Sequence, residues 1–348
     1  MPGRPESSSL SAPEPATGGT GRTRRAVGMI LRIAGTVALM AITLRGVDWP
    51  QLLELLETVD WRWWGAALAL GLVVQCLASI RWAVLARPIG FDYPLTVFIR
   101  RFFEGQFFSL CLPTSIGGDV VKAYRLAGTT RGRVLAGCTV LADRLSGLAA
   151  LGVIALTALI SNQASLPLLP TLLVGAALLA AVLLPASLIV GHLDTLANLL
   201  PSHPSVQSVV AGLLPYQQRP TLIVSAIMWS LLVQMGGALV VDAVGKSIGT
   251  DLPVSVWFAA VPLVALAMVL PISIGGVGIR EGGLAVLLAP HGVPAEKAVA
   301  IGLLWLLVTI VCGLFGGMMF LADRHPRFAF DGPGAGPSPE AGDSITGR

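Results

Sequence analysis

Several charged residues of this chain stand inside long apolar stretches, where burying a charge in a bilayer costs about 2.5–3.5 kcal/mol on insertion scales. A residue that bears such a cost needs a charged partner or a function. Arginine is well suited to hold a phosphate, because its planar guanidinium donates several hydrogen bonds at once. The residues concerned are Arg100, Arg101, Glu104, Asp119, Asp143, Arg144, Arg280 and Glu281.

The spacing of these charges predicts which of them can pair. Glu104 follows Arg101 by three residues, so a helix brings the two together; such a spacing is as typical of a structural ion pair as of a binding site. Asp143 and Arg144 are adjacent and point to different faces of a helix, so each needs a partner elsewhere. For Arg144 and Arg280, a bound phosphate and a structural ion pair near a helix end are both open alternatives.

One motif occurs twice, at residues 112–122 and 270–280, with the pattern L-P-x-S-I-G-G-x-x-x-K/R. Proline interrupts a helix and paired glycines allow unusual backbone conformations, and such a break at membrane depth is tolerated only beside protein or a watery cavity. Tight glycine turns in ordinary loops are the alternative. The motif contributes the candidate site residues Pro113, Ser115, Gly117, Gly118, Asp119 and Lys122, then Pro271, Ser273, Gly275, Gly276 and Arg280.

The composition predicts an all-α polytopic membrane protein. Hydrophobic residues make up 54% of the chain and charged residues 12%, against about 25% charged in soluble domains. Two apolar stretches, 94–121 and 253–289, are each interrupted by proline and glycine pairs, and we interpret them as re-entrant broken hairpins. Six further segments are long enough to span a bilayer: 27–45, 63–85, 134–160, 166–190, 221–243 and 298–321.

The two motif copies are expected to form an inverted repeat. Three full spans separate them, and an odd number places the second copy upside down relative to the first. Residues 1–24 and 323–348 are interpreted as disordered tails around a membrane domain of residues 25–322. If both tails are cytoplasmic, most Lys and Arg near the span ends also face the cytoplasm, Arg81 among them. We therefore expect a multi-pass protein of the cell (inner) membrane.

Other function classes find little support. A net charge of +4 gives no footprint for nucleic acid, and the four histidines and four cysteines have no metal-binding spacing. No phosphate-binding loop for ATP and no hydrolase or metalloprotease motif is present in the sequence. We expect no cofactor, no metal, no catalytic residue and no enzymatic activity.

Three segments together carry a resemblance: PTSIGGDVVKAYRL, LADRLSGLAALGVIAL and PISIGGVGIREGGLAVLL. They resemble the flippase-like membrane domain of the lysylphosphatidylglycerol synthase family, over roughly residues 25–322. The resemblance implies a multi-pass domain that moves phospholipid between leaflets. In full-length members a cytoplasmic domain makes the lipid, whereas a short tail follows residue 322 here, so aminoacyl transfer is not expected from this chain.

The leading hypothesis is a lipid flippase that moves a phospholipid or lipid-linked headgroup, with membrane lipid as its partner. A secondary transporter of a small polar solute is the alternative, and a lipid-modifying membrane enzyme or accessory subunit is a third. A homo-oligomer or a separate lipid-synthesising enzyme is a further candidate partner. The candidate substrate-binding residues are the two motifs' residues named above with Arg101, Glu104, Asp143, Arg144 and Glu281.

Overall fold

The computed structural model describes residues 19–45, 47–112, 117–127, 130–160, 191–193, 195, 204–269 and 272–323. Throughout those ranges the regular elements are helices, and none is a strand. The predicted all-α class is therefore confirmed for this part of the chain. The predicted span at 166–190 lies outside it.

Four described helices are long and apolar enough to cross a membrane. They are α3 (Trp61–Ala86), α6 (Thr130–Ile160), α10 (Pro220–Ser247) and α13 (Ala295–Leu321). Each covers one of the spans that the sequence predicts. Helix α1 (Gly19–Leu44) covers the predicted first span, and with α2 (Trp49–Glu57) it forms a pair bent by 93° that counts as a fifth span if the two are taken together.

Both interrupted stretches form two helices each, as the motif predicts. The first gives α4 (Leu95–Cys111) and α5 (Gly117–Leu126), and the second gives α11 (Val254–Val269) and α12 (Ile279–Leu288). Within each pair the helices pack against each other, so each stretch folds back on itself. Short 3₁₀ turns, η1 (Arg87–Ile89) and η2 (Ala289–His291), follow α3 and α12.

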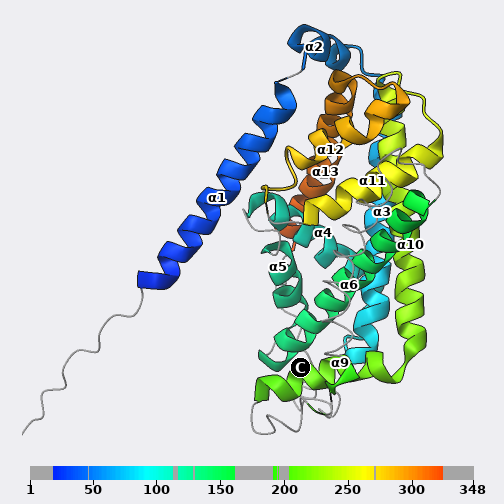
Figure 1. Ribbon diagram of the computed structural model, residues 1–348. Helices are drawn as coiled ribbons and strands as arrows, with labels where there is room; N and C mark the ends of the chain where they lie inside the picture. Colours follow the sequence, from blue (N-terminus) through cyan, green and yellow to red (C-terminus); the bar gives the residue numbers. More distant parts are fainter. Residues whose placement is uncertain are drawn as a thin grey trace, which may run out of the picture.

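The two buried apolar clusters of the bundle each surround one of these helix pairs. One joins α3, α4 and α6 around Trp82 and Phe98, and the other joins α10 to α13 around Trp257 and Ile301. Helices α3 and α10 pack along each other and connect the two clusters, as Figure 1 shows.

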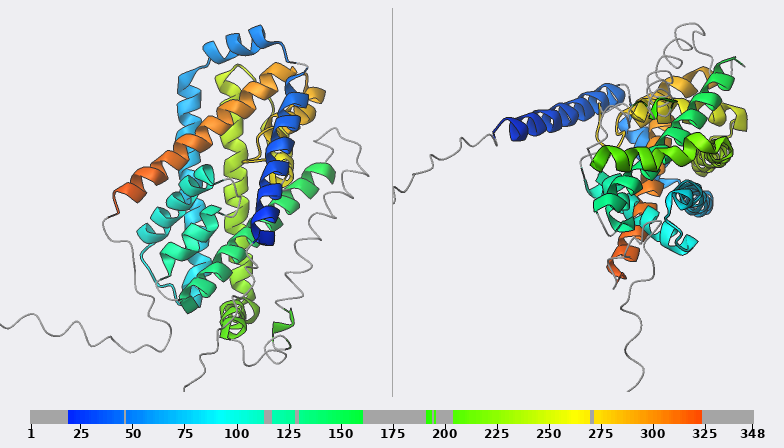
Figure 2. Two further views of the ribbon diagram at one scale, coloured as in Figure 1. Left: turned by 90° about the vertical axis from the view of Figure 1, so that its left-hand side faces the viewer. Right: turned by 90° about the horizontal axis from the view of Figure 1, so that it is seen from below.

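Helix α1 projects away from the bundle in Figure 1 and in the right-hand view of Figure 2. It touches the bundle at the second motif, where the Ile274 N–H donates to the Thr36 hydroxyl at 2.8 Å. Gly35 and Gly278 lie at the same contact; a Cβ on Gly35 would overlap the Ile272 carbonyl oxygen. The small residues therefore allow α1 to lie directly on the turn that precedes α12.

Helix α9 (Pro204–Gln218) was not predicted from the sequence. It lies across the end of α6 and next to η1, at the bottom of Figure 1. The Tyr216 hydroxyl on α9 donates to the Leu85 carbonyl of α3 at 2.8 Å, and burial raises the pKa of Tyr216 above its usual value. This hydrogen bond fixes α9 to the end of the bundle.

The contact between α4 and α5 depends on glycine. A Cβ at Gly118 would overlap the Gly105 carbonyl oxygen and the Ser109 hydroxyl, and a Cβ at Gly105 would overlap the Lys122 side chain. The two helices therefore approach more closely than any larger residue allows. This approach positions Asp119 and Lys122 beside α4.

We expect Gly118→Ala to destabilise the protein by about 1–3 kcal/mol, the usual cost of overpacking a tight contact. Gly137→Ala is the matched control, because a Cβ on this α6 glycine meets nothing within 4 Å. Thermal denaturation of the purified proteins in detergent measures the difference. Equal stability of the two variants would contradict the close helix contact.

Candidate functional site

A cavity of about 310 Å³ lies where the first helix pair meets the long helices. Helices α3, α4, α5, α6 and α10 supply most of its wall, and Val269 at the end of α11 completes it. Its apolar lining includes Phe102, Leu148 and Val233. Its polar lining consists of Gln75, Arg81, Gln106, Ser109, Asp119, Lys122, Asp143, Arg144 and Gln234.

Asp119, in the first turn of α5, is the centre of the first charge group. Its two carboxylate oxygens pair with different cations: Oδ1 with the Lys122 ammonium at 3.0 Å, and Oδ2 with the Arg144 guanidinium of α6. The sequence predicts that Arg144 needs a partner outside its own neighbourhood, and this partner lies in the repeat motif.

The two cations on Asp119 differ in how far they are exposed. The Lys122 side chain is 8% exposed, and its ammonium lies 4.4 Å from the Phe102 ring centroid and 5.4 Å from that of Trp82. Such cation–π contacts add to the ion pair and hold the ammonium in place. The Arg144 side chain is 48% exposed. Arg144 is therefore the cation that a ligand in the cavity can reach.

The second charge group lies deeper between α3, α6 and α10. Arg81 Nε donates to Asp143 at 2.8 Å, and its Nη1 donates to the Ser230 hydroxyl at 3.1 Å. Ser230 donates to the Ala226 carbonyl at 2.7 Å, and its oxygen lies 3.2 Å from the Ser146 hydroxyl oxygen. Both charged side chains are less than 10% exposed, at 8% and 4%, so this pair connects the three helices across the bundle interior.

Arg81 is predicted to flank a span end, but its side chain is buried and paired inside the bundle. It therefore says little about orientation. The available signal was a lone charge in the otherwise apolar stretch 63–85, which calls for a partner. The identity of that partner depends on helix packing.

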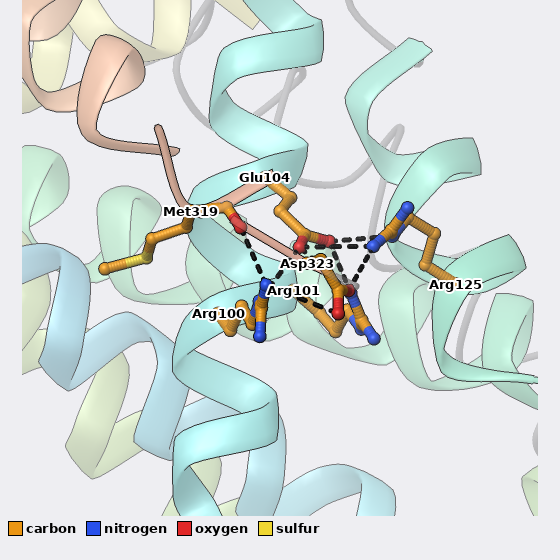
Figure 3. Close-up of polar contacts among 6 residues, drawn as sticks. All are labelled: Arg100, Arg101, Glu104, Arg125, Met319 and Asp323. Carbon is orange, nitrogen blue, oxygen red and sulfur yellow. Dashed lines mark hydrogen bonds and ion pairs between the residues drawn. The ribbon is translucent and has the colours of Figure 1, made fainter. Parts of the chain in front are cut away.

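Arg101 and Glu104 do not line the cavity. They belong to a neighbouring arginine–carboxylate cluster made by Arg100, Arg101, Glu104, Arg125 and Asp323 (Figure 3). Arg101 Nη1 lies 2.9 Å from both Glu104 oxygens and 2.7 Å from Asp323, so the predicted pairing of Arg101 with Glu104 is confirmed.

The arginine–carboxylate cluster joins three helices. Arg125 of α5 bonds Glu104 of α4 at 2.9 Å and also Asp323, which follows the end of α13. Arg100 reaches the Met319 carbonyl at 2.8 Å (Figure 3). Glu104 is completely buried. Asp323, predicted to belong to the C-terminal tail, is instead part of this cluster, and its pairing with Arg125 is not predicted from the sequence.

The described residues of the second motif do not line the cavity. Arg280 and Glu281, in the first turn of α12, are 3% and 0% exposed, and Gly276 is buried next to Met268. Ser273 and Gly275 lie in the turn before α12. Val269, which directly precedes the motif, lines the cavity. Among the remaining candidates, Gly117 and Gly118 are buried at the start of α5, whereas Pro113, Ser115 and Pro271 lie outside the described residues.

Metal chemistry has no candidate centre in the part of the chain that the structure describes. No group of three or more His, Cys, Asp or Glu residues in that part is placed to hold a metal ion. The cavity instead combines three cations with two carboxylates, a set suited to binding a charged polar group by hydrogen bonds and ion pairs.

These features define a multi-pass helical membrane protein with an open, charged cavity between its helices. The chain belongs to the family described as Lysylphosphatidylglycerol synthase TM region, whose model matches residues 29–317. The family resemblance seen in the sequence is thereby confirmed. No curated protein shows significant similarity to the chain.

Proposed function

We propose that this protein moves a phospholipid or lipid-linked polar headgroup between the leaflets of the membrane, and that the cavity beside α5 receives the headgroup. The observation that carries the proposal is Arg144, a half-exposed arginine on the cavity wall paired with Asp119 of the repeat motif. The family supports a membrane lipid-related function. A guanidinium in this place is suited to bind a headgroup phosphate.

The size of the cavity favours a headgroup over a whole lipid. A volume of about 310 Å³ lies at the lower end of the roughly 300–1,000 Å³ typical of small-molecule sites. Two acyl chains do not fit in addition to a headgroup, so they stay in the surrounding bilayer. A polar group therefore passes through the protein while the chains pass through lipid.

The charges around Asp119 allow the headgroup to bind without leaving a charge unpaired. When a phosphate takes Arg144, Asp119 keeps its ion pair with Lys122 at 3.0 Å. An unpaired buried charge would cost several kcal/mol, and this exchange of partners avoids it. The Arg81–Asp143 pair remains intact and holds the cavity wall.

The proposal is tested with purified protein in vesicles that contain a trace of headgroup-labelled phosphatidylglycerol. A membrane-impermeant reagent destroys the label in the outer leaflet, and the amount that remains reports movement between leaflets. We expect the protected half of the label to become accessible in protein-containing vesicles only. Unchanged lipid exchange together with uptake of a labelled polar solute would instead favour a solute transporter.

We further propose that the protein lies in the cell membrane with both termini in the cytoplasm, and that the two helix pairs enter from opposite sides. If 27–45 and 166–190 cross the membrane as predicted, an even total of six spans places both termini on one side, and the three spans between the helix pairs place the pairs on opposite sides. The placement of Lys and Arg near the span ends favours the cytoplasm for the termini. A fluorescent-protein fusion after Arg348 should fluoresce, and an alkaline phosphatase fusion at the same residue should be inactive. The reverse pattern would contradict this orientation.

A further inference from the structure

Arg280 is a buried arginine whose hydrogen-bonding capacity is mostly unused. Its side chain is in the first turn of α12 and 3% of the residue is exposed. Nη2 donates to the Gly275 carbonyl at 3.3 Å, and the guanidinium lies 5.0 Å from the Trp305 ring centroid. Nε and Nη1 are buried and have no hydrogen-bond partner among the described residues. Burial of a charged donor without a partner is costly.

The turn before α12 contains a second unpaired polar group. The Ser273 hydroxyl is buried and has no partner in the described part of the chain. The Arg280–Gly275 bond holds the guanidinium against this same turn. Two buried polar side chains, Ser273 in this turn and Arg280 just after it, thus lack hydrogen-bond partners for some of their atoms in the described part of the chain.

Glu281 adds a negative charge near Arg280 but forms no ion pair with it in the described part of the chain. One oxygen of its buried carboxylate, Oε2, accepts the Gly278 N–H at 2.6 Å and caps α12. Its other oxygen has no hydrogen-bond partner among the described residues, and no ion pair joins it to Arg280 there. Glu281 therefore serves the helix end, while the Nε and Nη1 donors of Arg280 stay available.

We propose that the turn from Ser273 to Arg280 is a second anion site, separate from the cavity, which takes a phosphate-class oxyanion. An oxyanion carries several acceptor oxygens, so one ligand can satisfy Arg280 and the Ser273 hydroxyl together. The ligand is either the phosphate ester of a lipid headgroup or inorganic phosphate. The lipid source rests on the transport function proposed above, whereas the anion site itself does not.

The test measures binding apart from transport. Titration calorimetry of the full chain in detergent uses inorganic phosphate, with chloride at equal ionic strength as the reference. Native mass spectrometry counts bound phosphatidylglycerol. The variants are Arg280→Gln and the milder Ser273→Ala. The matched control is Arg62→Gln, which removes an exposed arginine at the start of α3, and Arg144→Gln reports on the cavity alone.

We expect Arg280→Gln to remove one bound phosphate or phosphatidylglycerol molecule per protein, and Ser273→Ala to weaken its binding severalfold. Arg62→Gln and Arg144→Gln should both keep this bound molecule. If the wild-type protein binds phosphatidylglycerol but not inorganic phosphate at this site, the ligand is the lipid headgroup. If it binds both, the site also takes free oxyanions. Unchanged binding in both Arg280→Gln and Ser273→Ala overturns the proposal. If Arg280→Gln loses binding but exchanges lipid between leaflets at the normal rate, the anion site exists but does not take part in transport. Intact binding in a protein that moves no lipid contradicts only the proposed function.

Discussion

Replacing Arg144 with alanine should slow lipid exchange between leaflets by about tenfold to a hundredfold. A hydrogen bond to a charged group contributes about 1.5–3 kcal/mol, and every 1.4 kcal/mol is about a factor of ten. The side chain is 48% exposed, so its removal should leave the fold intact. Asp119 keeps Lys122 as its partner. The leaflet-resolved vesicle assay measures the change.

Two further substitutions make this result specific. Arg144→Lys keeps the positive charge and should retain part of the activity, whereas Arg133→Ala removes an exposed arginine from the same helix and should have no effect. Arg133 stacks on Tyr124 at 4.3 Å and does not line the cavity. Wild-type exchange rates in Arg144→Ala, or an equal loss in Arg133→Ala, would argue against a headgroup role for Arg144.

Glu104→Gln should produce the largest loss of stability. Glu104 is completely buried and contacts Arg100, Arg101 and Arg125. Without its charge, three arginines share Asp323 alone, and breaking a buried ion pair by removing one partner costs about 3–5 kcal/mol. The melting temperature of the purified protein in detergent should fall by on the order of 10 °C.

A compensating substitution separates charge from packing. The cluster carries three arginines and two carboxylates, a net charge of +1, and Glu104→Gln combined with Arg125→Gln restores that value. The double variant should therefore be more stable than Glu104→Gln alone. Glu54→Gln, an exposed position on α2, is the control and should melt like the wild type. A single variant as stable as the wild type would show that the cluster does not hold α4, α5 and α13 together.

The sequence predicts the described helices of this fold well where hydrophobicity alone decides. The stretches at 63–85, 134–160, 221–243 and 298–321 all coincide with long helices, because an apolar run of this length has no other stable form in a bilayer. Proline and paired glycines likewise predict both helix breaks. Helix α9 was missed because residues 204–218 are too short and too mixed in polarity to read as a span.

The sequence predicts the members of the site better than their arrangement. Asp119, Lys122, Asp143 and Arg144 were all candidates because charges are rare in apolar segments, and all four line one cavity. The sequence does not predict which charges pair. Arg81 and Asp143 are 62 residues apart, and their contact depends on how three helices are rotated. Hydropathy and spacing carry no information on that rotation.

The arginine–carboxylate cluster and the second motif show the same limit. Asp323 lies just beyond the last apolar residues, so composition assigns it to a tail, whereas its carboxylate joins α4 and α5 to α13. The repeat suggests that both motifs share one site. The structure instead places Arg280 near Trp305 and the Asp119 side chain in the cavity. Among the described residues of the two motifs, similar sequence thus gives similar helix breaks with different polar contacts.

Photo-crosslinking tests most directly whether a lipid headgroup enters the cavity. The protein is reconstituted with a phospholipid that carries a photoreactive group in its headgroup, irradiated, digested and analysed by mass spectrometry. Crosslinks at the cavity residues Gln106, Leu148 and Gln234, weakened in Arg144→Ala, are the predicted result. Crosslinks confined to the outward-facing Val224 and Leu314, with none in the cavity, would contradict the proposed headgroup route.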